Sequence, residues 1–452
     1  MRTWLAHPLA ILVPADVDGR GGIVVENDRI AEVLPAGAEP ALPVDVRFDA
    51  GGLVVLPGLI NTHHHFYQTL TRACPAALDK ELFAWLKSLY PIWAGLDEDM
   101  IHVATRLAAA ELLLSGCTTT VDHHYIFPEN ARQALDVQVD AIRATGIRAV
   151  LTRGSMSLGE DQGGLPPRST IQAEDAILAD CERVIDQFHD RAAGAMLQIA
   201  LAPCSPFSVT EGLMRDTAIL ARSRGVRLHT HLGETGDEDD FCLATFGVRP
   251  AKYLERVGWM DSDVWLAHGI HFRDEEIVRL GRAGVGVCHC PSSNMVLGSG
   301  ICRTRELEKA GCPVGLGVDG SASNDCSNLV QEVRQALLIG RLRYGSAALG
   351  HKDALRWATA GSAACLGRDD IGAIAPGKQA DLALFALDEP RFSGAGDPLA
   401  ALVLCGAHRA THVMVAGQWR VRDDELLGMD LERLRAEHEE AARGLLQAGT
   451  GM

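Results

Sequence analysis

The chain has 452 residues, of which 47% are apolar and 22% charged, a composition typical of a large globular protein. Acidic residues exceed basic ones by 59 − 42 = 17, so the chain repels nucleic acid and anionic membrane surfaces, and we expect neither as a partner. The sequence shows no signal peptide, no apolar run of about 18 residues and no CxxC pair. Its 12 cysteines therefore predict reduced thiols in a cytoplasmic protein without a membrane span.

The two ends of the chain predict short strands. In residues 1–56 the turn Asn27-Asp28 separates two apolar runs and indicates a hairpin. After about residue 370 the same pattern returns in "IGAIAPGKQADLALFALD" and "HVMVAGQWRVRDD", and a charged helix, "DLERLRAEHEEAARGLLQ", follows. We expect residues 1–56 and 368–452 to meet in one small β-sandwich.

Residues 57–367 alternate apolar strands with helical patterns. In "NLVQEVRQALLIGRL", for example, Leu329, Val333 and Ala336 recur at helical spacing. Eight such βα units in roughly 310 residues predict a (β/α)₈ barrel. The segments that carry its strands are 54–66, 118–125, 147–154, 197–207, 226–235, 264–272, 284–294 and 314–324.

One motif imitates a nucleotide site. "GLGVDG", residues 315–320, fits the pattern G-x-G-x-x-G of dinucleotide-binding folds. That pattern belongs on the first strand of a Rossmann unit, whereas here it ends the eighth predicted strand. We therefore do not expect a dinucleotide cofactor.

Histidines collect where the predicted strands end, which is where barrel enzymes place their reacting groups. In "NTHHHFY", alternation puts His63 and His65 on one face and His64 on the other. In "HTHLGET", His229 and His231 share a face, so spacing alone does not indicate which of the two belongs to the site. The sixth and eighth strands end in His268 and Asp319.

These residues predict a metal site. A single histidine at a strand end is more often structural than a ligand, but here that would have to hold at four strand ends. Three imidazoles and a carboxylate suit Zn²⁺, with one position left for water, and Fe²⁺ uses the same ligands. Glu234, three residues after His231, is the expected acid and base, and His268 would polarise the substrate or steady the attacking water.

At this point the sequence resembles the amidohydrolase superfamily, in its branch of deaminases with one metal ion. The matching motifs run in order over nearly the whole chain: "PGLINTHHHFYQTLTR", "HTHLGET", "LAHG", "HCPSSNMVLGSG", "VGLGVDGSASN" and "IGAIAPGKQADLALF". The resemblance implies a distorted (β/α)₈ barrel with a β-sandwich built from both termini. It also implies a metal site formed by His63, His65, His231 and Asp319.

The resemblance further implies the roles of single residues. Glu234 would shuttle protons between water, ring nitrogen and ammonia, His268 would hydrogen-bond at the metal centre, and Asp319 would also accept a proton from water. The histidines outside the pattern are expected to pack or to support the site: His64, His123, His124 and His229. Relatives with two metal ions bridge them with a lysine on strand four, and "LQIALAPCSPF" has none, which favours one metal and deamination.

The substrate pocket is less specific. Related deaminases often carry Pro-His or Pro-Arg after strand four, whereas Pro203-Cys204 stands here, which argues against ordinary guanine and adenosine-type substrates. Gln68 offers a donor and an acceptor to a ring edge. Arg153 would meet a carbonyl oxygen or, alternatively, form an ion pair at the rim. The candidate substrate contacts are therefore Gln68, Arg153 and Cys204.

The segments "NTHHHFYQTLTRA", "DHHYIFP", "LTRGSMSLGE" and "APCSPFSV" most resemble deaminases that act on 8-oxoguanine, which implies the products uric acid and ammonia. The alternatives are isoxanthopterin, guanine and hydroxylated s-triazines. A non-catalytic scaffold of this fold would lack metal ligands, whereas every ligand position is filled here. We expect a small heterocyclic amine as substrate, assembly into a homo-oligomer, and a lid formed by the Gly- and Pro-rich loop 158–170.

Overall fold

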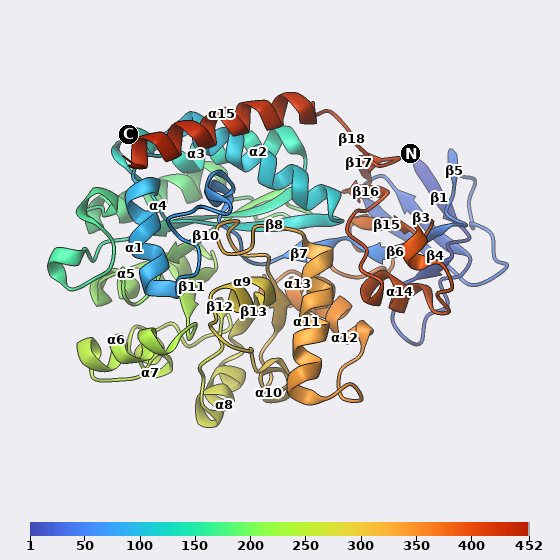
Figure 1. Cartoon of the computed structure of the whole chain (residues 1–452). Coiled ribbons are helices and arrows are strands. Elements are labelled where there is room, and N and C mark those ends of the chain that lie inside the picture. Colours follow the sequence, from blue (N-terminus) through green and yellow to red (C-terminus); the bar gives the residue numbers. More distant parts are fainter. Residues whose placement is uncertain (451–452) are drawn as a thin grey trace.

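The protein is described by a computed structural model that covers residues 1–450, with the side chains of residues 1–448. Its centre is a closed barrel of eight parallel strands (Figure 1). Each of the eight predicted segments overlaps one barrel strand, so the predicted barrel is confirmed. The strands are β7 (Leu59–Asn61), β8 (Cys117–His124), β9 (Arg148–Ser155), β10 (Leu197–Pro203), β11 (Leu228–Leu232), β12 (Val264–His268), β13 (Gly286–His289) and β14 (Val314–Leu316).

Helices surround the barrel, as βα connections require (Figure 1). The predicted helix after strand eight is α11, and the Asn328 side chain caps it by accepting from the Gln331 amide at 3.2 Å. The helices are α1 (Leu82–Trp93), α2 (Glu98–Leu114), α3 (Ala134–Thr145), α4 (Glu174–Phe188), α5 (Glu211–Arg224), α6 (Gly236–Phe246), α7 (Pro250–Arg256), α8 (Asp274–Ala283), α9 (Pro291–Val296), α10 (Thr304–Ala310), α11 (Leu329–Tyr344), α12 (His351–Arg356), α13 (Ser362–Cys365), α14 (Pro398–Leu404) and α15 (Leu431–Thr450).

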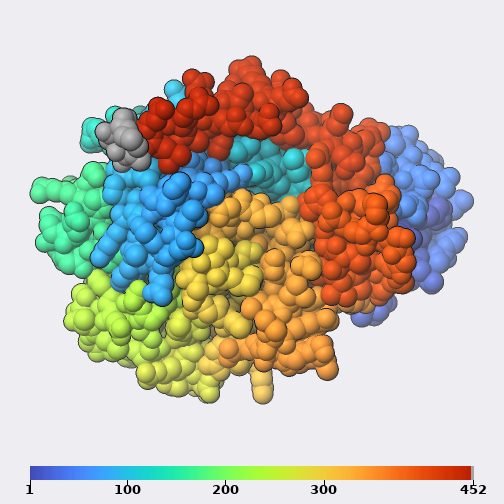
Figure 2. Space-filling model, in the orientation of Figure 1, coloured from blue at the N-terminus to red at the C-terminus, as the bar shows by residue number. Residues whose placement is uncertain are grey.

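The C-terminal helix α15 lies along α1 and α2, and its red surface borders the blue and cyan surface of those helices in Figure 2. His438 ties it to the barrel, because its Nε2 lies 3.0 Å from the Thr69 hydroxyl. No helix among the described residues is both long and apolar enough to cross a membrane.

Two further sheets are built from the ends of the chain, one from N-terminal strands alone and the other from strands of both ends (Figure 1). One has the order β4-β3-β1-β5 and the other the order β18-β17-β16-β15-β6-β2, and their facing side chains, such as Leu5, Val55 and Leu384, share one core. The predicted hairpin joins β3 and β4, with Asn27 at φ 55°. The strands are β1 (Arg2–Ala6), β2 (Ala10–Ile11), β3 (Gly22–Glu26), β4 (Arg29–Leu34), β5 (Val46–Asp49), β6 (Leu53–Pro57), β15 (Leu382–Ala386), β16 (His412–Val415), β17 (Gln418–Arg422) and β18 (Glu425–Leu426).

The sandwich and the barrel share the apolar segment that the sequence predicted as one strand. The structure corrects this: β6 belongs to the sandwich, where it pairs with β15, and β7 belongs to the barrel. Gly58 lies between the two strands, at a position where only glycine fits, because a Cβ there would lie 2.1 Å from Oγ1 of Thr118. The domain bounds 1–56, 57–367 and 368–452 stay a prediction.

The interior of the barrel is apolar below the strand ends. Ile60, Val121, Val150, Ala200 and Trp265 pack there against residues that follow strand eight, namely Ala363, Cys365, Leu366 and Ile371. This packing closes the lower barrel, so the polar residues at the upper, carboxyl ends of the strands stand on a rigid floor.

Candidate metal centre

The predicted ligands lie at the carboxyl ends of barrel strands. His63 and His65 follow β7, His231 lies on β11, and His268 ends β12. Two site residues adopt the left-handed backbone region that favours glycine, His268 at φ 71° and Asp319 at φ 65°. Such conformations cost about 1–3 kcal/mol each and cluster at functional sites. They let a side chain point in a direction that the backbone of a regular strand does not allow.

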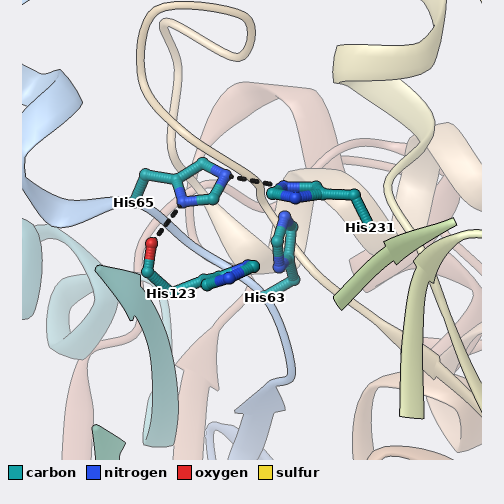
Figure 3. A group of neighbouring side chains, drawn as sticks. All are labelled: His63, His65, His123 and His231. Atoms are coloured by element: carbon teal, nitrogen blue, oxygen red, sulfur yellow. Dashed lines mark hydrogen bonds between the residues drawn. The ribbon is translucent and has the colours of Figure 1, made fainter. Parts of the chain in front are cut away.

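Ring nitrogens and one carboxylate converge on a single point. Nε2 of His63 and Nε2 of His65 lie 3.2 and 3.3 Å from Oδ1 of Asp319. Figure 3 shows the histidines, with Nε2 of His65 3.2 Å from Nε2 of His231. Four tetrahedral ligands at a Zn–N distance of about 2.0–2.1 Å lie about 3.3 Å from one another. These three separations therefore fit neighbouring ligands of one small cation. Candidate ligand atoms lie within 4.8 Å of one another in two overlapping groups, His63, His65, His123 and His231, and His63, His268 and Asp319.

The tautomers fit a metal as well, because each Nδ1 is held by an acceptor. Nδ1 of His65 donates to the carbonyl of His123 and Nδ1 of His231 donates to the carbonyl of Cys204, both at 2.7 Å. Nδ1 of His63 lies 2.8 Å from Nε2 of His229. All three rings therefore turn an unprotonated Nε2 toward the centre, the arrangement that metal ligands need.

The charges of the site follow the same logic. Burial lowers the pKa of His63 and the pKa of His231 well below the usual value, so both rings are neutral. Burial alone would raise the pKa of Asp319, but His63 and His65 beside it outweigh that effect and hold the pKa well below its usual range. The centre therefore offers neutral nitrogens and one carboxylate.

His123 also brings a ring nitrogen within 4.8 Å of those of His63, His65 and His231. Its Nε2, however, donates to the carbonyl of Ala202 at 2.9 Å, and its ring stacks on that of His231 with the centroids 4.7 Å apart. Its own carbonyl holds His65, as Figure 3 shows. His123 thus contacts the cluster through its ring and its carbonyl, and its role as a support stays a prediction.

Glu234 and His268 lie beside this centre. Nε2 of His268 is 3.4 Å from Oε2 of Glu234 and 3.8 Å from Oδ2 of Asp319. Asn294 orients His268, since its Oδ1 lies 3.0 Å from Nδ1 of that ring. Burial, together with the charge of Asp319, raises the pKa of Glu234 well above its usual value, so this carboxyl group can carry a proton near neutral pH.

A cavity opens above the centre. Gln68 and Cys204, two of the three predicted substrate contacts, line it, and the Gln68 Oε1 accepts from the Ala322 amide at 3.4 Å. The other lining residues are aliphatic and aromatic side chains on one hand and the polar residues of the centre on the other: Leu82, Trp85, Leu86, Tyr90, Tyr125, Phe207 and Leu297, and His65, His231, Glu234, His268, Asp319 and Ser323. Such a lining, with apolar walls and polar groups to orient a ligand, suits a flat heterocycle.

Arg153, the third predicted contact, does not line this cavity. It is buried, and its guanidinium pairs with Asp180 at 2.6 Å, donates to Oε1 of Gln172 at 2.9 Å and lies 3.7 Å from the ring centroid of Phe127. Because its donors are engaged in this way, the structure corrects the prediction that Arg153 contacts the substrate. It supports the alternative prediction of an ion pair, although this pair is buried and not at the rim.

Sequence reasoning missed several cavity and support residues. Trp85, Tyr125 and Phe207 lie on the apolar walls, and no periodic pattern distinguished them from core residues. Ser293 donates to Oδ2 of Asp319 at 2.7 Å, and Asn294 holds His268. Both lie inside the quoted motif "HCPSSNMVLGSG", which was the available signal.

The loop 158–170 lies against the segment that follows β10. The Leu158 amide donates to the carbonyl of Ser208 at 3.0 Å, and the Leu165 amide donates to that of Phe207 at 3.1 Å. Since Phe207 lines the cavity, the loop is in a position to affect access to it. Its role as a lid stays a prediction.

Known proteins are similar to this chain in sequence and in fold. The profile of the amidohydrolase family matches residues 54–420. The chain is 60% identical to 8-oxoguanine deaminase of Pseudomonas aeruginosa over 98% of this chain and 99% of that one. It is 35% identical to an isoxanthopterin deaminase of an unknown prokaryotic organism over 91% and 89% of the two chains. A crystal structure of atrazine chlorohydrolase from Arthrobacter aurescens TC1, complexed with zinc, superposes with a TM-score of 0.91 at 32% identity, over 98% and 100% of the chains.

Proposed function

Because this chain belongs to the amidohydrolase family, we propose that it hydrolyses the 2-amino group of 8-oxoguanine to give uric acid and ammonia. The observation that carries the proposal is 60% identity with a curated 8-oxoguanine deaminase over nearly the full length of both chains. The geometry supports the same reaction class, since a candidate cation site, a buried carboxyl group with a raised pKa and a cavity lie together.

We propose one Zn²⁺ per chain, held by His63, His65, His231 and Asp319. The separations near 3.3 Å and the inward-facing Nε2 atoms support this set, and Fe²⁺ is the alternative ion. When bound, the ion supplies Lewis acidity that makes water nucleophilic near pH 7.

The residues of this chain then move the protons. Asp319 and Glu234 take protons from the attacking water, and Glu234 delivers one to the ring nitrogen next to C2. Nε2 of His268 lies 3.4 Å from Oε2 of Glu234 and accepts from that carboxyl group when it is protonated, because Nδ1 of His268 donates to Oδ1 of Asn294. The second proton, taken from the water by Asp319, then passes by way of Glu234 to the amino group, which leaves as ammonia while the carbonyl at C2 forms. The raised pKa of Glu234 suits a group that alternates between acid and base.

The substrate itself would be held by Gln68 and the apolar walls. Gln68 offers both a donor and an acceptor to the ring edge, and the Cys204 side chain leaves space where a larger residue would stand. We also propose that the protein works in the cytoplasm as a homo-oligomer.

The test is ammonia release by the zinc-loaded protein with 8-oxoguanine, guanine, isoxanthopterin and a hydroxylated s-triazine. We expect 8-oxoguanine to be preferred by more than about a hundredfold in kcat/KM, which corresponds to roughly 2.7 kcal/mol. Glu234→Gln should lower kcat by about 10²–10⁴ with zinc content unchanged. A preference for another amine would overturn the substrate, and an active Glu234→Gln variant would overturn the proton shuttle.

A further inference from the structure

A second cavity, of about 300 Å³, lies at the opposite end of the barrel from the histidine cluster. Its walls include residues near the starts of four strands, such as Val150 on β9, Gln198 on β10 and Trp265 on β12. The segment Leu366–Arg368, which follows α13, completes the wall. Because substrate binds at the carboxyl ends of barrel strands, the proposed deamination has no use for this cavity.

The cavity is cationic in an acidic protein. Arg191, Arg227 and Arg368 line it together with His189, and no Asp or Glu lines it. The chain as a whole carries a net charge of −17. A concentration of guanidinium groups against such a background creates a local positive potential that attracts small anions.

Two of these guanidinium groups lack a carboxylate partner. Arg368 is neutralised by Asp370, which accepts from its Nε and from its Nη2, both at 2.7 Å. Arg191 and Arg227, in contrast, form no ion pair with any residue that the structure describes. Arg191 donates only to the carbonyl of Arg224, and Arg227 donates only to backbone carbonyls, those of Ser262 and Cys365, both at 2.9 Å.

Arg227 is held in place before any ligand arrives. Its guanidinium carbon lies 6.0 Å from the ring centroid of Trp265, and its Nη1 lies so close to Gly367 that a Cβ there would approach it to 2.5 Å. Its Nε is buried without a hydrogen-bond partner. Burial lowers the pKa of Arg227, and the charge of Asp263, which forms no ion pair with it, offsets only part of that effect.

We propose that this cavity is a second ligand site, which binds a small organic phosphate through the guanidinium groups of Arg191 and Arg227. Guanidinium groups match phosphate oxygens in charge and geometry, which explains why two of them stand here without a carboxylate. The apolar wall of Val150, Val226 and Leu366 would contact the organic part of the ligand. This proposal does not depend on the proposed deamination.

Isothermal titration of the full-length, zinc-loaded protein tests the site, with ribose 5-phosphate, inorganic phosphate and ribose as probes. We expect ribose 5-phosphate to bind more tightly than inorganic phosphate, and ribose not to bind. Ribose binding as tightly as its phosphate, or no binding of either phosphate up to 10 mM (roughly the weakest affinity worth assigning to a site), would overturn the proposal.

Variants locate the binding. Arg191→Gln, at an exposed position, and Arg227→Gln should each weaken ribose 5-phosphate binding at least about tenfold, the loss of one charge-assisted hydrogen bond. Arg435→Gln, which removes an exposed charge from α15, is the matched control and should bind like the wild type. Because Arg227 also holds backbone carbonyls, replacing it disturbs the fold as well as the site. The Arg191 variant is therefore the decisive test of the ligand site. Unchanged binding by Arg191→Gln would contradict the assignment even if Arg227→Gln fails to fold.

Discussion

His229 Nε2 lies 2.8 Å from Nδ1 of His63, on the far side of that ring from Asp319. Nδ1 of His229 faces the carbonyl of Trp265 at 2.8 Å, and a carbonyl only accepts, so this nitrogen carries the proton of the neutral ring. Nε2 of His229 must then accept from Nδ1 of His63. The chain of donors fixes the tautomer in which Nε2 of His63 is free to bind a cation.

The first prediction follows from this relay. His229→Leu removes the acceptor behind His63, and we expect the affinity for zinc to fall about 10–100-fold, as is usual when a partner of a metal ligand is lost. Zinc retention against a competing chelator measures the effect. His412→Gln, a change at a buried histidine of the sandwich, is the control and should retain zinc like the wild type. Equal retention by the His229 variant would show that the relay is not needed.

The second prediction separates ligand from support within the cluster. His63→Ala should abolish zinc binding, because one of the four proposed ligands disappears. His123→Gln should keep most of the zinc binding, since the new glutamine side chain can still donate to the carbonyl of Ala202. The backbone carbonyl of residue 123, which holds His65, is unchanged. Metal analysis of the purified variants decides, and a zinc-free His123→Gln protein would make His123 a ligand.

The third prediction concerns the backbone that carries Glu234. The two oxygens of Glu238 accept from the amides of Gly233 and Glu234, each at 3.0 Å. Glu238→Gln places a donor against one of these amides and shifts Glu234. We expect kcat to fall about 10–100-fold with zinc content and KM nearly unchanged.

Steady-state kinetics with zinc analysis measures this effect. Glu276→Gln, at a buried glutamate of α8 that binds Arg249, is the matched control and should keep kcat. A Glu238→Gln enzyme with wild-type kcat, or one that loses zinc, would contradict the positioning role.

The fourth prediction is a pH dependence of stability. Burial raises the pKa of Asp122 to about 7, although the Phe66 amide and Gln138 donate to it. Between pH 4 and pH 7 this carboxyl keeps its proton in the folded chain and loses it in the unfolded chain, as for any acid whose pKa folding raises, so its contribution to stability falls as pH rises through about 4–7.

Asp122→Asn removes that titration. Oε1 of Gln138 has no partner, so a flipped Gln138 amide would accept from the new Asn side chain. Relative to the wild type, the variant should gain about 2–4 kcal/mol of unfolding free energy between pH 4 and pH 7.5. Denaturant unfolding across this range tests it, and a difference that is independent of pH would contradict the assignment.

Local patterns were sufficient to predict most of the fold. Apolar β-branched runs, turn residues and helical periodicity depend on neighbours in the sequence, so the eight barrel strands, the Asn27 hairpin and helix α11 were all predictable. The split at Pro57-Gly58 was not, because it depends on Thr118, a residue 60 positions away that leaves no room for a Cβ.

The sequence by itself also determined which residue types gather at the strand ends, since alternation brings His63 and His65 to one face and closure of a barrel brings strand ends together. Only the tertiary structure decided what each residue meets there. His231 faces His65, whereas His229 faces the back of His63, although both share one face of β11. Arg153 forms an ion pair with Asp180 on α4 and does not line the cavity. Partners of this kind belong to elements far apart in the chain, and their choice depends on the packing of whole elements, which no local pattern records.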